Sequence, residues 1–171
     1  MAEALLEAIG EAVRVHGASA LSLRDVARRA GVSHAAPAHC FKNKAGMLSA
    51  FAAQGFQRLA DVVIDEISQS EPVDGGQALA AIGRAYVGFA VMEPARFEVM
   101  FRLDVLDETS SDLQEASDLA FGLLVGTIER CKREGRLGNH DELLVALSAW
   151  SLVHGLASLW ISGQLQTTSR R

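Results

Sequence analysis

The segment from Leu143 to Ser169 contains no aspartate, glutamate, lysine or arginine, and it constrains the fold of the chain more than any other feature. As one helix it is long enough to cross a bilayer. Small residues recur in it at helical spacing and form one mildly polar stripe, at Ser148, Ser151, Gly155, Ser158 and Ser162. A stripe of mostly larger residues lies next to it, at Leu143, Leu147, Trp150, His154, Ala157 and Ile161. Because a helix uncharged on all sides is normally buried on all sides, we expect the helix over 141–164 to pack between its own core and a second copy, not in a membrane.

The whole chain is predicted to be all-α. No stretch alternates apolar and polar residues with β-branched enrichment, so strands are not expected. Apolar residues at helical spacing predict helices over 3–16, from Ser22 to just before Gly31, and over 33–41, 43–68, 77–92, 94–102, 112–134 and 141–164. Residues 104–111 are expected to form a loop, and the tail 167–171 is expected to be frayed.

Residues that begin or end helices support these boundaries. Gly17 is expected to stop the first helix. Ser22 and Asp25 have the spacing of a capping box, in which the hydroxyl accepts a hydrogen bond from an otherwise unsatisfied backbone amide. Ser33 is expected to cap the helix that ends near Phe41. Pro94 suits the first position of a helix, because proline has no amide proton to donate there.

Charge is distributed unevenly along the chain. The formal net charge is −5, but residues 1–48 carry six basic and four acidic side chains. A slightly basic head on an acidic body favours a nucleic-acid-binding module attached to a solubilising domain. The two cysteines, Cys40 and Cys131, form neither a disulfide framework nor a CxxC pattern, so a cytoplasmic location is expected. Cys40 is expected to be a buried small hydrophobe.

The first three helices have the arrangement of a helix-turn-helix, with a tight turn at Gly31 between the second and third. Five apolar residues are spaced to form its small core: Leu23, Val26, Ala27, Val32 and Phe41. Three arginines are expected to project outward, at Arg24, Arg28 and Arg29. Four residues of the third helix could then face a major groove: His34, Ala35, Ala38 and His39.

Residues 21–33, which read LSLRDVARRAGVS, resemble the signature of TetR-family regulators, and Phe41, Lys44 and Leu48 also stand at family positions. The resemblance covers residues 5–50 and implies a DNA-binding domain over 1–48, whose third helix contacts the major groove. It implies that Lys44, at the start of the fourth helix, contacts a phosphate. The DNA-contacting residues implied in this way are Ser22, Arg24, Arg28, Ser33, His34, Ala35, Ala38, His39 and Lys44.

Two departures from the family pattern leave an alternative open. The family commonly has a tyrosine where this chain has Ala38, and that tyrosine usually reaches a backbone phosphate. The usual basic extension before the first helix is also missing. Both losses remove phosphate contacts, which supply much of the affinity for DNA. The alternative is a helical ligand-binding dimer whose helix-turn-helix has lost DNA binding.

Residues 94–102 and 150–165 resemble the Trp-His-Gly subclass of TetR regulators, through Trp150, His154 and Gly155. This resemblance implies a ligand-binding and dimerisation domain over 49–171, with a homodimer formed through 112–134 and 141–164. The implied ligand pocket is lined by Phe89, Met92, Phe97, Met100, Phe101, Phe121, Trp150 and His154. A solid core explains any one of these residues equally well, and His154 can be a ligand contact or a hydrogen-bonded core histidine. Gly122 and Gly126 suggest close helix packing.

No pattern points to an enzyme, because the chain has no nucleophile elbow, HExxH, P-loop or GxGxxG motif. His34, His39 and Cys40 do not converge on one helix face, so no metal site is expected. We expect no cofactor. The expected partners are operator DNA, a small-molecule effector and a second copy of the chain, and the family default is repression released by ligand.

Overall fold

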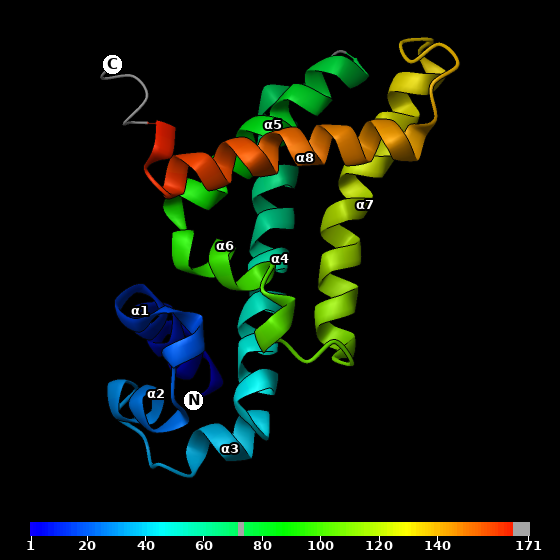
Figure 1. Cartoon of the computed structure of the whole chain (residues 1–171). Coiled ribbons are helices and arrows are strands. Elements are labelled where there is room, and N and C mark those ends of the chain that lie inside the picture. Colours follow the sequence, from blue (N-terminus) through cyan, green and yellow to red (C-terminus); the bar gives the residue numbers. More distant parts are fainter. Residues whose placement is uncertain (72–73, 166–171) are drawn as a thin grey trace. The chain divides into compact units, whose positions relative to one another are not determined.

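The computed structural model describes residues 1–71 and 74–165, and this part of the chain contains helices, turns and no strand. The predicted frayed tail at 167–171 lies outside the described residues. Within them the α-helices are α1 Ala2–Ala20, α2 Leu23–Arg29, α3 Ala36–Phe41, α4 Lys44–Ser70, α5 Gly75–Met92, α6 Pro94–Met100, α7 Ser111–Arg133 and α8 Glu142–Ile161. A short 3-10 helix, η1 Leu103–Val105, follows α6. The predicted all-α fold is therefore confirmed (Figure 1).

Contacts divide the chain into two compact units. Unit one contains residues 1–56 and 95–117, and unit two contains residues 57–94 together with the chain from 118 onward. The division falls inside α4 and α7, and after the first residue of α6. The domain boundary at residue 48 stays a prediction.

In unit one, α1 packs on α2 and α2 packs on α3 (Figure 1). Gly17 interrupts α1 at φ +74°, where the sequence predicts the helix to stop, and helical structure resumes for a few residues beyond it. The largest fully buried side chains of this unit come from α1, α2, α3, α4 and α6, and include Leu5, Ile9, Val26, Pro37, Met47, Leu48, Phe51 and Met100.

A close contact joins α4 and α6 within unit one. A Cβ placed on Gly55 would lie 2.7 Å from Sδ of Met100, so a larger residue at this crossing would require the Met100 side chain to move. Arg96 is buried there, with its guanidinium 4.2 Å from the ring centre of Phe51. It donates hydrogen bonds to the carbonyl of Phe51 at 3.3 Å and to Oε1 of Gln54 at 2.9 Å. A buried cation is thus solvated by backbone, amide and ring contacts.

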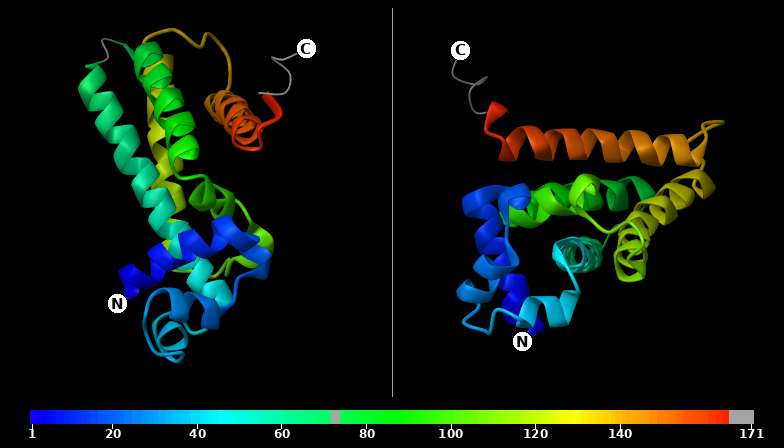
Figure 2. Two further views of the ribbon diagram at one scale, coloured as in Figure 1. Left: turned by 90° about the vertical axis from the view of Figure 1, so that its left-hand side faces the viewer. Right: turned by 60° about the horizontal axis from the view of Figure 1, so that its bottom comes forward.

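In unit two, α8 lies against α5 (Figures 1 and 2). The contact follows from the inner face of α5, whose buried residues recur at helical spacing at Ala78, Ala81, Ile82, Ala85, Tyr86 and Phe89. From α7, Ile128 and Cys131 are buried in the same unit. α5 begins two residues earlier than predicted, because Asp74 caps it by accepting a hydrogen bond from the amide of Gln77 at 2.9 Å.

Candidate nucleic-acid interface and effector site

The predicted helix-turn-helix is formed by α2, a turn and α3 in unit one. Ser22 caps α2 as expected, accepting a hydrogen bond from the amide of Asp25 at 3.1 Å. Gly31 adopts φ +66° in the turn, a left-handed conformation that glycine adopts without strain. Val26 and Ala27 are fully buried and hold α2 against its neighbours.

The start of the third helix differs from the sequence prediction. α3 begins at Ala36, its N-cap is Ala35, and no side chain caps it, so the assignment of Ser33 as the cap was wrong. Proline favours the first helical turn, and Pro37 in that turn places the start of α3 three residues after Ser33. His34 and Ala35 therefore lie in the turn before α3 and not within the helix.

Nearly all residues predicted to contact DNA are exposed in unit one: Ser22, Arg24, Arg28, Ser33, His34, Ala35, Ala38 and His39. Cys40 is also exposed, so its predicted burial was wrong. Pro37 is buried and Phe41 half-buried, one turn apart on α3, and Cys40 lies off the face that they define.

Of the three arginines in α2, two pair with Asp25. Arg28 contacts its carboxylate at 2.5 Å and Arg29 at 2.7 Å. Hydrogen bonds from Arg29 and Arg28 hold the pKa of the Asp25 carboxyl below its usual value. Arg29 is half-buried and also lies 3.3 Å from Nε2 of His16, so the prediction that it projects outward was wrong. Arg24 is the exposed arginine at the start of the helix.

The half-buried Lys44 begins α4, and its ammonium group lies inside a small network of unit one. Nζ of Lys44 donates to the carbonyl of Ser19 at 2.6 Å. The hydroxyl of Ser19 accepts a hydrogen bond at 2.8 Å from Arg102, which also forms an ion pair with Asp104 at 2.7 Å. From the sequence, Lys44 was expected to contact a DNA phosphate, and its hydrogen bond to the carbonyl of Ser19 was not predicted.

In unit two, a cluster of aromatic side chains connects α5, α7 and α8. The phenolic oxygen of Tyr86 lies 2.8 Å from Nδ1 of His154, and Nε1 of Trp150 donates to the same oxygen at 3.2 Å. The rings of Phe121 and Trp150 meet edge to face at 6.0 Å. Tyr86 was missed in the sequence, although a buried tyrosine hydroxyl needs a partner, and this is the chain's single tyrosine.

Burial shifts the two titratable groups of this cluster. It raises the pKa of the Tyr86 phenol, and it lowers the pKa of the His154 imidazole. Both shifts favour the uncharged form. The cluster is therefore a neutral hydrogen-bonded network at neutral pH.

The predicted pocket residues fall into separate groups. Phe121, Trp150 and His154 meet around Tyr86 in unit two. Phe97 and Met100 are buried in unit one, where the ring of Phe101 packs against Phe97 at 5.2 Å and Phe56 at 5.5 Å. In unit two, Phe89 is buried, whereas Met92 is 85% exposed at the end of α5. A single pocket that contains all eight residues stays a prediction.

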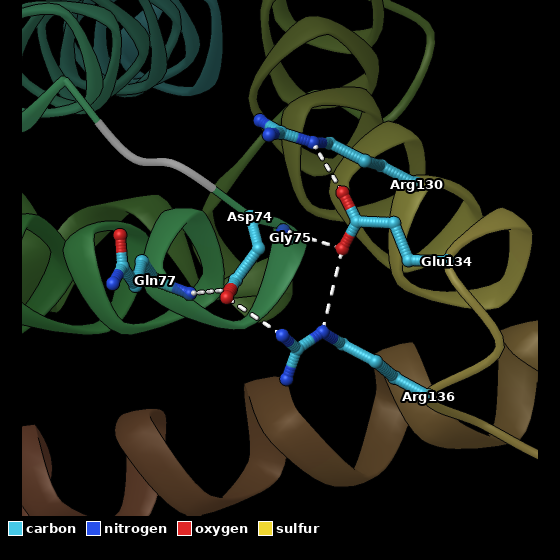
Figure 3. A network of polar contacts seen from close by, with 6 residues as sticks. All are labelled: Asp74, Gly75, Gln77, Arg130, Glu134 and Arg136. Atoms are coloured by element: carbon cyan, nitrogen blue, oxygen red, sulfur yellow. Dashed lines mark hydrogen bonds and ion pairs between the residues drawn. The ribbon is translucent and has the colours of Figure 1, made fainter.

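The start of α5 is fixed to the end of α7 by the polar network in Figure 3. The amide of Gly75 donates to Oε2 of Glu134 at 2.8 Å, and Arg130 contacts the other carboxylate oxygen at 2.9 Å. Arg136, just after α7, pairs with Asp74 at 2.6 Å and lies 3.4 Å from Glu134. A Cβ on Gly75 would lie 2.7 Å from Sγ of Cys131, so the two helices meet without room for a side chain.

The single chain does not bury α8 on all sides. Its buried residues are Ala146 and Ala157, and its exposed large hydrophobics are Leu143, Leu144, Leu147, Leu152, Leu156, Leu159 and Trp160. By length and composition alone, α8 is also apolar enough to cross a membrane, which is weak evidence. On α7, a Cβ added to Gly122 or Gly126 would meet no neighbouring described atom within 4 Å, so the close packing expected of these glycines does not occur inside the described chain.

Comparison with known proteins identifies the family. The family described as "Tetracyclin repressor-like, C-terminal domain" matches residues 79–171, and "Bacterial regulatory proteins, tetR family" matches residues 5–51. Comparison with curated proteins found no match. The resemblance to the Trp-His-Gly subclass stays a prediction.

Solved structures share the fold. A protein of unknown function from Rhodococcus sp. RHA1 is 30% identical with a TM-score of 0.83, over 96% of this chain and 84% of that chain. The transcriptional regulator FadR from Bacillus subtilis, in complex with stearoyl-CoA, is 15% identical with a TM-score of 0.78, over 96% and 89%. PfmR from Thermus thermophilus, a TetR family transcriptional regulator, is 20% identical with a TM-score of 0.74, over 90% and 84%. One family model covers more than half of the chain, and a second covers the helix-turn-helix. The chain therefore belongs to the TetR family of DNA-binding transcriptional regulators.

Proposed function

We propose that this chain is a homodimeric transcriptional repressor that leaves its operator when a small molecule binds to unit two. The observation that carries the proposal is the exposure of the turn and α3 after a well-capped α2. His34, Ala38 and His39 are solvent-accessible there, and Arg24 and Arg28 of α2 are exposed as well. A short helix presented in this way fits the major groove of DNA.

The exposed residues would have different roles in DNA binding. Arg24 and Arg28 supply positive charge for phosphates, which fixes the position of the head on the duplex. His34 and His39 carry ring nitrogens that can hydrogen-bond to base edges. Ala38 offers a methyl group only, so it contributes apolar contact and no phosphate bond.

A second copy of the chain is the proposed cover for α8. The small stripe at Ser148, Ser151 and Gly155 lies on the side of α8 opposite the buried Ala146 and Ala157. Leu152 is 74% exposed beside this stripe. On α7, Gly122 and Gly126 are exposed as well, and glycines let a partner helix approach closely. Burying both faces against a symmetry mate would remove a large apolar surface from water.

Cytoplasmic location and the absence of an enzymatic role belong to the same proposal. A regulator of transcription must reach the chromosome, and α8 covered by a partner is not available to a bilayer. Two free cysteines fit a reducing compartment.

The deciding experiment is a gel shift at low salt with DNA from upstream of the protein's own gene. We expect a retarded complex with two half-sites, about one helical turn or a small multiple apart. The double variant Arg24→Ala/Arg28→Ala should abolish the shift while the protein stays dimeric.

A dimer that gives no shift at low salt would contradict the proposal. It would favour the alternative, a ligand-binding dimer whose head no longer binds DNA. Ala38, which lacks the tyrosine hydroxyl that usually reaches a backbone phosphate in the family, is the observation behind that alternative.

A further inference from the structure

The end of α1 is held from two sides within unit one. Ser19 lies in the last turn of α1, where backbone carbonyls have no amide partner inside the helix. Nζ of Lys44, the first residue of α4, donates to the Ser19 carbonyl at 2.6 Å. The guanidinium of Arg102, which follows α6, donates to the Ser19 hydroxyl at 2.8 Å. Ser19 therefore connects the start of α4 to the segment after α6.

The direction of the Arg102 side chain is fixed by acidic neighbours. Its guanidinium donates two hydrogen bonds to the carboxylate of Asp104, at 2.7 and 2.8 Å. Such a two-point contact fixes the plane of the guanidinium as well as its position. Glu98, on α6, lies 3.8 Å away and adds a weaker attraction. The contact to Ser19 is thus made by a cation that is already held in place.

The segment that carries Arg102 is also attached to α4 by a second contact. The amide of Asp107 donates to the hydroxyl of Ser49 at 2.8 Å, and Ser49 is buried. Because Ser49 lies in the second turn of α4, this contact ties residues 102–107 to the same helix that Lys44 begins. Arg102 and Lys44 therefore belong to one connected part of unit one, with Ser19 between them.

A lysine that is already held has an advantage in binding phosphate. A free lysine side chain loses much rotational freedom when it is fixed against a ligand. The hydrogen bond to Ser19 already restricts Lys44, and it engages one of three ammonium protons, so the others can reach a phosphate. Less entropy is then lost on binding, which is the general benefit of preorganisation. The advantage depends on Ser19 staying where Lys44 can reach it.

Building on the proposed function, we propose that Arg102 is a positioning residue for DNA binding. It holds the Ser19 hydroxyl, and the Ser19 carbonyl in turn holds the ammonium group of Lys44 for a backbone phosphate. Arg102 itself stays paired with Asp104 and does not contact DNA. Three segments far apart in the sequence, at the end of α1, at the start of α4 and after α6, thus form the phosphate contact together.

Ser19→Ala and Arg102→Met test this role while Lys44 is kept. Ser19→Ala removes the hydroxyl but keeps the carbonyl and every charge, so it serves as the test if Arg102→Met does not fold. We expect each variant to weaken binding to operator and to random DNA about threefold, because Lys44 is then less restricted before it binds. Gel shifts measure this, and Arg14→Met, which removes an exposed charge from α1, controls for the charge lost in Arg102→Met.

The slope of log affinity against log salt separates positioning from direct contact. Both variants still neutralise the same phosphates, so their slopes should equal that of the wild type. In a Lys44→Ala background, neither Ser19→Ala nor Arg102→Met should weaken binding further. A slope reduced by about one in Arg102→Met would show that Arg102 contacts a phosphate itself. Equal losses with and without Lys44 would show a general effect on the head, and either result would overturn the proposal.

The hold on Lys44 is also measurable without DNA. The chain has three lysines, so the nitrogen NMR signal of each side-chain ammonium group can be assigned by replacing that lysine with arginine. An ammonium group in a hydrogen bond exchanges its protons with water more slowly than a free one, and its signal is sharper. The Lys44 signal should broaden in Ser19→Ala and in Arg102→Met. A signal as sharp as that of the wild type in both variants would overturn the proposal.

Failure of this inference is distinguishable from failure of the proposed function. The gel shift of the wild type reports on DNA binding before any of these residues is changed. If the wild type gives no shift, the proposed function fails and the positioning role falls with it. If the wild type shifts operator DNA and both variants bind as tightly, Arg102 has no positioning role and the DNA-binding function stands.

Discussion

The ammonium group of Lys44 donates a hydrogen bond to the backbone carbonyl of Ser19, at 2.6 Å. This ties the first residue of α4 to the segment between α1 and α2. An ammonium group has three protons, so the same lysine can hold Ser19 and still contact a phosphate. Removing Lys44 therefore has two separable effects, one on DNA and one on the head itself.

Lys44→Ala should weaken DNA binding equally on operator and random sequences, because phosphates carry no sequence information. The slope of log affinity against log salt should fall by about one. Gel shifts over a salt series measure both effects, and Arg14→Ala, which removes an exposed charge from α1, is the matched control. A changed sequence preference would show that Lys44 contacts bases, and a melting curve would report the loss of the bond to Ser19.

Ala38→Tyr should tighten DNA binding. The exposed position on α3 can place a phenol against a backbone phosphate, a contact that contributes about 1 kcal/mol, or less than tenfold in affinity. The gain should be similar on specific and random DNA. Ala38→Phe is the control that adds the ring without the hydroxyl, and an equal gain from both variants would assign the effect to packing.

Gly155→Asp or Ser151→Asp should convert a dimer into monomer or aggregate. Either change places an unpaired charge in the middle of the proposed interface on α8. Sedimentation measures the outcome, and Ala80→Asp, exposed on α5, is the control that should stay dimeric. A wild type that is monomeric at micromolar concentration would contradict the interface.

The network of Figure 3 should make unfolding sensitive to acid. Hydrogen bonds from the amides of Gly75 and Gln77 hold the pKa values of Glu134 and Asp74 below their ordinary values of 4.5 and 3.8. A depressed folded-state pKa stabilises the fold above the unfolded value, and this stabilisation is lost as the pH falls through the folded value.

Glu134→Gln should therefore lower the Tm at neutral pH and flatten the fall of Tm at acid pH. Thermal melts over a pH series measure this. Asp61→Asn, which removes an exposed carboxylate from α4, should leave the pH dependence as in the wild type. If Tm falls at acid pH in Glu134→Gln as it does in the wild type, the Glu134 carboxylate does not contribute to the acid sensitivity of the fold.

Local chemistry predicted the helices, and it could not predict their partners. Ser22 and Gly17 act within a few residues of themselves, so their effects on helix ends were visible in the sequence. Tyr86 and His154 are 68 positions apart, and Gly75 and Glu134 are 59 apart. Neither pair has a signal in helical periodicity, because periodicity identifies a face and not what covers it.

The start of α3 was predicted wrongly, whereas the short helices α2 and α6 begin where the sequence predicted. In α3, one proline decided where the helix begins, and the six residues of the helix left Cys40 outside the packed face. The long α8 was predicted within a few residues at each end, and its burial between the chain's own core and a second copy stays a prediction, because the single chain covers only one side of the helix.

Because the leucines of α8 are exposed in a single chain, regulation by this protein should depend on its concentration in the cell. If a second copy covers them, pairing follows mass action, and a cell that holds few copies contains mostly single chains with one reading head each. Growth dilutes the protein and a burst of synthesis restores the pairs. The operator would then respond to the rate of production of its own repressor as well as to the effector.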